Sequence, residues 1–235
     1  RGLTVASGID VLTHAIESFV SVLASDYTKP YSLESMKIVF KYLPESVEKG
    51  AKAVKAKEKM SNASCLAGMA FANAFLGICH SLEGKYDVPH GIANAMLISE
   101  VINYNAVEAP TKVGIFPQYK YPEALERYAY ISEFLGFGGK TLYEKKDNLI
   151  AEIEKLKERI GIPKSIQEYG IGEAEFLVAL DEMALDAFDD QCTGANPRYP
   201  LIEELKEIYK RAYYGPAKEV KAVAKTVAKK ATKKK

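Results

Sequence analysis

Cysteine is scarce in this sequence, and its spacing excludes a common class of small secreted protein. The 235 residues include three cysteines, Cys65, Cys79 and Cys192, an odd number without close spacing. Proteins that depend on disulfides carry paired cysteines at short, regular spacings. We therefore predict free thiols and a reducing compartment, which means a cytoplasmic location.

Long apolar runs and an N-terminal signal segment are also missing. No stretch approaches the ~20 apolar residues that a bilayer-spanning helix requires, and the first residues do not form an apolar leader. We therefore expect a soluble chain with no membrane partner. Because the sequence begins at Arg1 without a starting methionine, we also expect it to be a piece of a longer polypeptide.

A basic surface is missing from most of the chain, although the C-terminus is rich in lysine. Residues 216–235 contain eight lysines and one glutamate, so this tail carries +7 while residues 1–215 carry −6. Nothing in the body therefore argues for a nucleic-acid partner. Val220, Val223 and Val227 would share one face if the tail were a surface-binding helix. We favour the simpler interpretation of a solvated, frayed terminus.

Strand patterns and phosphate-binding loops are absent as well. Few stretches alternate with a period of two, and no glycine-rich GxGxxG or Walker-type segment occurs. We predict an all-α, bundle-like domain over residues 1–215 without a nucleotide-binding sheet. The predicted helices are Gly8–Leu23, Tyr31–Lys49, Ala56–Cys79, Gly91–Tyr104, Pro122–Leu135, Leu142–Ile160, Glu173–Ala187 and Leu201–Tyr213.

Local signals give details of the first three helices. Ser7 and Asp10 resemble a capping box that would start the first helix. Pro44 should interrupt the second helix. The third helix carries small residues that let another helix approach closely, so it should be central and buried on most sides. These residues are Ala63, Ala67, Ala70 and Ala74.

All three histidines of the chain, with one aspartate, could bind a single metal ion. Asp10 and His14 are four residues apart, which places them on one face of a helix. His80 and His90 bracket a short loop that can fold back beside them. Three imidazoles and one carboxylate form a four-ligand set for a divalent transition metal, and they do not choose between Fe(II) and Zn(II).

A simpler interpretation of the same residues exists for each one alone. A single buried histidine is usually a hydrogen-bonded core residue, and an aspartate and a histidine at helical spacing are often only a surface pair. The spacing is also less specific than a paired Cys-x-x-Cys framework. The four residues together nevertheless favour a metal site.

Six long segments resemble the iron-dependent alcohol dehydrogenases. The similarity is greatest to the C-terminal half of the alcohol dehydrogenase module in bifunctional aldehyde-alcohol dehydrogenases, and it covers residues 2–215. The segments are GLTVASGIDVLTHAIESFVS, NASCLAGMAFANAFLGICHS, PHGIANAMLI, FPQYKYPEALERYAYISEFLG, KERIGIPKSIQEYGI and AFDDQCTGANPRYPLIEELKEIYKRAYYG.

The resemblance implies a helical domain that holds Fe(II), next to a separate α/β domain that binds NAD(H) and is absent from this sequence. Residue by residue, it implies that Asp10, His14, His80 and His90 are the metal ligands. It also implies a substrate channel around Phe71, in GMAFAN, and Cys192, in QCTGANPR. From the residues alone, Phe71 is equally well a core aromatic, and Cys192 is better explained as a buried, unreactive thiol.

One departure from the family concerns the segment HSLEGKYDVPH between His80 and His90. It is roughly four residues shorter than in the family and lacks a further histidine that faces the nicotinamide. Glu83 or Lys85 would take part of that space. This difference bears more on hydride positioning and proton relay than on the metal ligands.

A second dense group of polar residues is Asp189, Asp190 and Arg198, in FDDQCTGANPR. It would either shape the mouth of the channel or form a helix C-terminus and turn held by Arg–Asp pairing. We favour the turn.

The sequence is therefore compatible with three candidate functions. The first is the metal-binding portion of an NAD-dependent alcohol dehydrogenase, which acts on a small alcohol or aldehyde with a cofactor domain of the same polypeptide. The second is a helical metal-binding or interaction module that has lost catalysis. The third, a metal-dependent hydrolase, is the weakest, since no glutamate is placed as a base beside a metal-bound water. The resemblance also allows a homo-oligomer.

Overall fold

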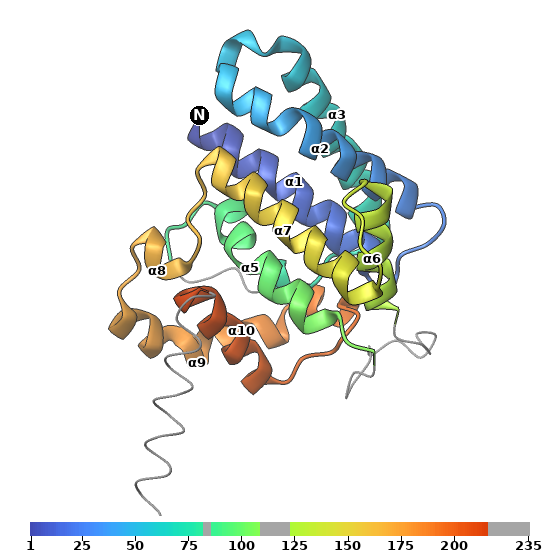
Figure 1. Cartoon of the computed structure of the whole chain (residues 1–235). Helices are drawn as coiled ribbons and strands as arrows, with labels where there is room; N and C mark the ends of the chain where they lie inside the picture. Colours follow the sequence, from blue (N-terminus) through green and yellow to red (C-terminus); the bar gives the residue numbers. More distant parts are fainter. Residues whose placement is uncertain (82–85, 109–122, 216–235) are drawn as a thin grey trace, which may run out of the picture.

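The computed structural model describes residues 1–81, 86–108 and 123–215. Helices account for all of the regular structure in these ranges, so the predicted all-α class is confirmed there (Figure 1). The elements are α1 (Gly2–Val20), α2 (Lys29–Lys49), η1 (Gly50–Lys52), α3 (Val54–Ala74), α4 (Ile78–Ser81), α5 (His90–Asn105), α6 (Ala124–Phe134), α7 (Leu142–Ile160), α8 (Ile166–Tyr169), α9 (Glu173–Asp189), η2 (Gln191–Ala195) and α10 (Ile202–Tyr214).

Helix α1 is the centre of the arrangement. It packs against α2, α3, α5 and α6. In Figure 1 the α2–α3 pair lies at one end of the molecule, while α8, α9 and α10 gather at the other end. α1 is long and apolar enough to cross a membrane, contrary to the expectation that no such stretch exists, but two thirds of its apolar window is buried inside the protein. Burial of this kind is typical of a core helix, and α1 brings polar side chains into the middle of the fold.

The start of α1 corrects a prediction from the sequence. The helix begins at Gly2, so Ser7 is an internal residue and does not form a capping box with Asp10. The Ser7 hydroxyl instead donates to the carbonyl oxygen of Leu3, at 2.8 Å, one turn earlier. Serine can satisfy its hydroxyl in this way within a helix, and a sequence pattern does not distinguish this bond from a cap.

Pro44 does not interrupt α2, which continues unbroken to Lys49. Proline has no N–H group, so one helical hydrogen bond is lost at this position. Pro44 is buried, and the burial of apolar neighbours such as Leu43 and Val47 keeps this part of the helix intact.

Helix α3 is shorter and more exposed than predicted. Its buried residues are Ala56 and the predicted small-residue stripe Ala63, Ala67, Ala70 and Ala74, and the opposite face is open. The stripe does allow close packing against α1 and α2, but one apolar stripe buries only one face of a helix. The helix ends at Ala74 because Phe75 adopts a φ of 59°, which a non-glycine residue adopts only under constraint.

The remaining predicted helices are present with ends that differ by a few residues, and α7 has the predicted bounds. The short helices η1, α4, α8 and η2 were not predicted as separate elements. The lysine-rich tail and the connection over residues 109–122 lie outside the described residues, so those predictions and the division at residue 215 are untested.

Candidate metal centre

The three ionisable side chains of helix α1 lie on one face of it. Asp10, His14 and Glu17 are spaced four and three residues apart, which is the helical repeat. The Asp10 Oδ2 and His14 Nε2 atoms are 3.7 Å apart. The Glu17 side chain is 2% exposed. α1 therefore contributes two predicted ligands and one buried carboxylate that was not predicted.

His80 reaches α1 through a tight turn between α3 and α4. Phe75 starts the turn with its positive φ, and Gly77 continues it where there is no room for a side chain. A Cβ atom on Gly77 would lie 2.9 Å from Glu17 Oε1 and 2.9 Å from Asn196 Oδ1. This close approach brings the backbone of the turn onto the Glu17 carboxylate and delivers His80 to the face of α1.

Glu17 accepts hydrogen bonds from three N–H groups of this turn. The backbone N–H of Gly77 donates to Oε2 at 3.0 Å, and that of Cys79 donates to Oε1 at 2.6 Å. The His80 Nδ1 atom lies 2.6 Å from Oε2. Because a carboxylate accepts hydrogen bonds, the proton of this contact is on Nδ1.

His90 is the first residue of α5, and Gly91 lets this helix approach α1. A Cβ atom on Gly91 would lie 2.0 Å from the carbonyl oxygen of Ala6 and 2.8 Å from Asp10 Cβ. No residue other than glycine fits this contact without movement of a helix. The close approach places His90 Nε2 3.5 Å from Asp10 Oδ1.

Asn94, one turn after His90 on α5, is a further polar residue of the centre. Its Nδ2 atom lies 3.1 Å from both Asp10 Oδ1 and His90 Nε2. Its Oδ1 atom is buried and has no hydrogen-bond partner among the described residues. Asn94 therefore holds the Asp10 carboxylate against the start of α5.

The structure brings the four predicted ligands together. One candidate ligand atom from each of Asp10, His14, His80 and His90 lies within 4.8 Å of every other. His80 Nε2 is 3.7 Å from Asp10 Oδ1, similar to the 3.7 Å and 3.5 Å separations of the other two rings from Asp10. In a tetrahedral site with bonds of about 2.1 Å, neighbouring ligand atoms are about 3.4 Å apart. Each histidine nitrogen lies within about 0.3 Å of this spacing from one or the other oxygen of Asp10, so the residues fit a divalent transition metal if the ligand atoms that are up to 4.8 Å apart move closer together.

The environment of His80 supports the same conclusion. The His80 side chain is 6% exposed, and its Nε2 atom is buried without a hydrogen-bond partner in the described part of the chain. The His14 and His80 rings are stacked, with centroids 4.6 Å apart. A buried nitrogen without a partner is costly in free energy unless something coordinates it. A metal bound at the common point of the four side chains would do so.

The ionisable groups of the centre favour positive charge between two carboxylates. Burial lowers the pKa of His80, but the nearby carboxylates of Asp10 and Glu17 outweigh it and raise this pKa to about 9. Burial lowers the pKa of His14 to about 4, despite the nearby charge of Asp10. Burial raises the pKa of Asp10, but the neighbouring His80 and His14 rings bring it below its usual value. The centre therefore suits a cation electrostatically.

The two predicted channel residues lie beside the centre. Phe71, on α3, stacks on the His14 ring with centroids 4.7 Å apart. Cys192 is half-buried in η2, which packs against α4, the helix of His80. Burial and the neighbouring Asp190 raise the pKa of Cys192 to about 12, which agrees with an unreactive thiol. Whether Phe71 and Cys192 line a substrate channel stays a prediction.

The predicted pairing of Arg198 with aspartate is wrong. Arg198 Nη2 pairs with Glu204 Oε1 at 2.7 Å, and its Nη1 donates to the carbonyl oxygen of Tyr104 at 2.7 Å. Asp190 instead accepts a hydrogen bond from the backbone N–H of Cys192, at 2.7 Å, while Asp189 ends α9. Arg198 therefore joins the end of α5 to the start of α10, because an acidic partner across the turn is closer than the aspartates.

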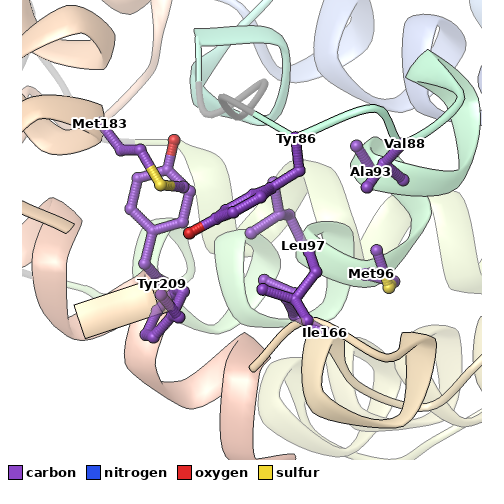
Figure 2. A pocket seen from close by; sticks show the side chains of 10 residues that line it. Tyr86, Val88, Ala93, Met96, Leu97, Ile166, Met183 and Tyr209 are labelled. Carbon is purple, nitrogen blue, oxygen red and sulfur yellow. The ribbon is translucent and has the colours of Figure 1, made fainter. Parts of the chain in front are cut away.

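The connection between His80 and His90 is anchored at its second half. Tyr86 points into an apolar pocket whose lining includes Leu97 of α5, Met183 of α9 and Tyr209 of α10 (Figure 2). Its hydroxyl is buried without a hydrogen-bond partner among the described residues. Residues 82–85 lie outside the described residues, and with them the predicted roles of Glu83 and Lys85.

Glu17, Asn94 and Gly91 were missed from the sequence. Glu17 gave a usable signal, because it continues the helical spacing of Asp10 and His14 in an apolar helix. Asn94 likewise lies one helical turn after His90. The importance of Gly91 had no signal in the sequence, since it depends on the distance between two helices.

Comparison with known protein families shows to which family the chain belongs. Residues 4–213 match the C-terminal part of the Fe-containing alcohol dehydrogenase family. The chain belongs to the iron-containing alcohol dehydrogenase family. The resemblance predicted from the six sequence segments is therefore confirmed.

Individual relatives agree with this membership. The chain is 51% identical over 213 residues to an aldehyde-alcohol dehydrogenase of Clostridium acetobutylicum, covering 89% of this chain and 25% of that protein. It is 40% identical over 217 residues to an NADPH-dependent butanol dehydrogenase of Clostridium saccharobutylicum, covering 91% of this chain and 51% of that protein. Among solved structures, an iron-containing alcohol dehydrogenase from Thermococcus thioreducens aligns with a TM-score of 0.78 and 32% identity, over 92% of this chain and 51% of that one.

The chain spans a quarter to a half of the length of these relatives. The part of the family that it matches is the C-terminal part. The activities of the whole relatives belong to longer polypeptides.

Proposed function

We propose that this chain is the metal-binding portion of an NAD-dependent alcohol dehydrogenase. The observation that carries the proposal is the convergence of Asp10, His14, His80 and His90, whose candidate ligand atoms lie within 4.8 Å of one another. Family membership favours Fe(II) as the metal, and Zn(II) fits the same three nitrogen atoms and one oxygen atom. The substrate would be a small alcohol or aldehyde.

When bound, the metal would supply a Lewis acid that polarises the oxygen of the alcohol or aldehyde, which assists hydride transfer to or from the nicotinamide. The residues of this chain would tune and shield that position. Asp10 would offset part of the metal charge, and Asn94 would keep its carboxylate in place. Phe71, stacked on His14, would exclude water from one side of the centre.

The NAD(H) would be bound by another part of the polypeptide. No strand and no nucleotide-binding sheet occur in residues 1–81, 86–108 and 123–215. A relative of about twice the matched length uses NADPH, according to its name. A cofactor-binding domain of the parent polypeptide is therefore the partner that we propose. A cytoplasmic location and self-association into a homo-oligomer stay predictions.

A hydrolase fits the centre less well than a dehydrogenase. Besides Asp10, Glu17 is a carboxylate in the described part of the chain that contacts a predicted ligand and that a hydrolase could use as a base. Both of its oxygen atoms accept hydrogen bonds from the turn of His80, on the Nδ1 side of that ring. Glu17 is therefore engaged on the side of His80 away from Asp10.

The proposal can be tested with the whole 235-residue chain, purified without oxygen. We expect about one metal ion per chain by elemental analysis, and loss of that metal in His90→Ala. The chain alone should not oxidise NADH in the presence of a short aldehyde. Co-expression with the N-terminal cofactor domain of a relative should restore NADH oxidation.

Other results would change the conclusion in distinct ways. A chain that binds metal but stays inactive with the cofactor domain would be a metal-binding module that has lost catalysis. Ester or peptide hydrolysis without NAD would favour a hydrolase. A chain that does not bind Fe(II), Zn(II) or Co(II) would contradict the proposal itself.

A further inference from the structure

Glu17 is a buried carboxylate that the proposed chemistry leaves without a role. Its side chain is 2% exposed, and burying a carboxylate is costly in free energy unless hydrogen bonds compensate. The compensation comes from one turn of the chain, through the backbone N–H groups of Gly77 and Cys79 and the Nδ1 atom of His80. The Glu17 carboxylate is therefore hydrogen-bonded to the segment that carries one predicted ligand.

The contact with Nδ1 determines which nitrogen atom His80 can offer to a metal. With its proton on Nδ1, the neutral ring carries its lone pair on Nε2. Nε2 is the atom that lies 3.7 Å from Asp10 Oδ1 and is buried without a hydrogen-bond partner in the described residues. A carboxylate behind a metal-binding histidine orients the ring and raises its basicity.

The backbone of the same turn also depends on Glu17. The turn begins at Phe75, whose φ of 59° is strained for a residue with a side chain. Gly77 approaches Glu17 so closely that a Cβ atom would lie 2.9 Å from Oε1. The turn is also tied to the end of α1 by the Ser21 hydroxyl, which donates to the carbonyl oxygen of Ala74. Contacts with α1 thus hold the turn in a conformation that it would not adopt alone.

We propose that Glu17 is the positioning residue of the metal centre: it fixes His80 as an Nε2 ligand and holds the turn that presents it. This inference rests on the proposed metal-binding function. Glu17 does not touch the substrate or the metal, and it acts only through His80. The Nδ1 proton stays on the ring, hydrogen-bonded to Glu17.

The test compares two variants of the whole chain that each weaken the contact between α1 and this turn. Glu17→Gln replaces one acceptor oxygen with an NH₂ group that would face an N–H donor. Ser21→Ala removes the hydroxyl bond to Ala74 and leaves His80 unchanged. A variant with a merely structural effect should behave like Ser21→Ala.

The first measurement is the affinity for Co(II), by absorption titration, and for Zn(II), by competition. Loss of an outer hydrogen-bond partner usually weakens metal binding by about 10- to 100-fold. We expect a weakening of this size for Glu17→Gln and less than about twofold for Ser21→Ala. Equal affinity of Glu17→Gln and the unchanged chain would overturn the role of Glu17 while leaving the metal site in place. Absence of metal binding in the unchanged chain would overturn the proposed function as well.

The second measurement starts with the unchanged chain, so its first result does not depend on the folding of a variant. In the Zn(II)-loaded, ¹⁵N-labelled chain, NMR should show His80 bound through Nε2, with a slowly exchanging, strongly hydrogen-bonded proton on Nδ1. That proton signal should move or disappear in Glu17→Gln and persist in Ser21→Ala. Coordination of zinc by His80 Nδ1, or an Nδ1 without a proton, would overturn the proposal.

Discussion

Replacing Gly91 with alanine should separate α5 from α1 and remove one ligand from the metal centre. The added Cβ atom would lie 2.0 Å from the carbonyl oxygen of Ala6, whereas an ordinary carbon–oxygen contact is about 3.3 Å or longer. The start of α5 must therefore move by roughly 1.3 Å. Metal–ligand distances tolerate only about 0.2 Å, so His90 should no longer bind.

The size of the effect follows from the packing and from the lost ligand. Forcing an extra methyl group into a closely packed contact costs about 1–3 kcal/mol. In a body of this size that corresponds to a fall in Tm of roughly 2–4 °C per kcal/mol. Loss of a direct ligand should weaken metal binding by more than the roughly 100-fold that is typical when an outer partner is lost.

The assay combines thermal unfolding with Co(II) titration, and the chain offers a matched control. Gly68, within α3, has no atom within 4 Å of the position of an added Cβ. Gly68→Ala should therefore raise stability by up to about 1 kcal/mol, since alanine favours a helix over glycine, and leave metal binding unchanged. Wild-type metal affinity in Gly91→Ala would refute the argument that the close helix approach delivers His90.

Three further predictions concern groups around the centre. In a chelator-treated chain, the pKa of His80 is raised from 6.5 to about 9, which should add up to about 3 kcal/mol to the free energy of unfolding below pH 6.5. Urea unfolding should show that this stability is lost as the pH rises from 6.5 to 9. A flat profile would count against the ion pairs of His80. Burial and Asp190 raise the pKa of Cys192 to about 12. Alkylation of Cys192 by iodoacetamide at pH 8 should therefore be at least roughly 100-fold slower than alkylation of the exposed Cys65. Equal rates by mass spectrometry would contradict the burial of Cys192. Tyr86→Phe removes a buried hydroxyl without a partner among the described residues, so the free energy of unfolding should stay the same or rise by up to about 1 kcal/mol, and a fall of more than that would show that the hydroxyl is bonded.

Local signals in the sequence were sufficient for the class of fold and for some helix ends. Helix α7 has the predicted bounds, Leu142–Ile160, because both ends have strong local signals. Thr141 and Glu144 form a capping box at its start, and Gly161 adopts a left-handed conformation at its end. The start of α1 differs from the prediction because Ser7 bonds within the helix and does not cap it, and α3 ends early because Phe75 adopts a positive φ. These features depend on packing, which periodicity does not report.

In the proposed metal centre, too, the sequence reports the local geometry and not the tertiary contacts. The spacing of Asp10 and His14 placed them correctly on one helix face, since helical geometry is local. Their meeting with His80 and His90 depends on the approach of α4 and α5 to α1. Glu17 lies on the same helix face, but its role depends on N–H groups of the turn before and at His80, and no sequence pattern identifies those partners.

X-ray absorption at the metal edge of the Fe(II)- or Zn(II)-loaded chain tests the central claim most directly. The account predicts a first shell of nitrogen and oxygen atoms at about 2.0–2.2 Å, with outer-shell scattering from three imidazole rings that falls to two in His80→Ala. A first shell that contains sulfur at about 2.3 Å, or imidazole scattering that His80→Ala leaves unchanged, would contradict it.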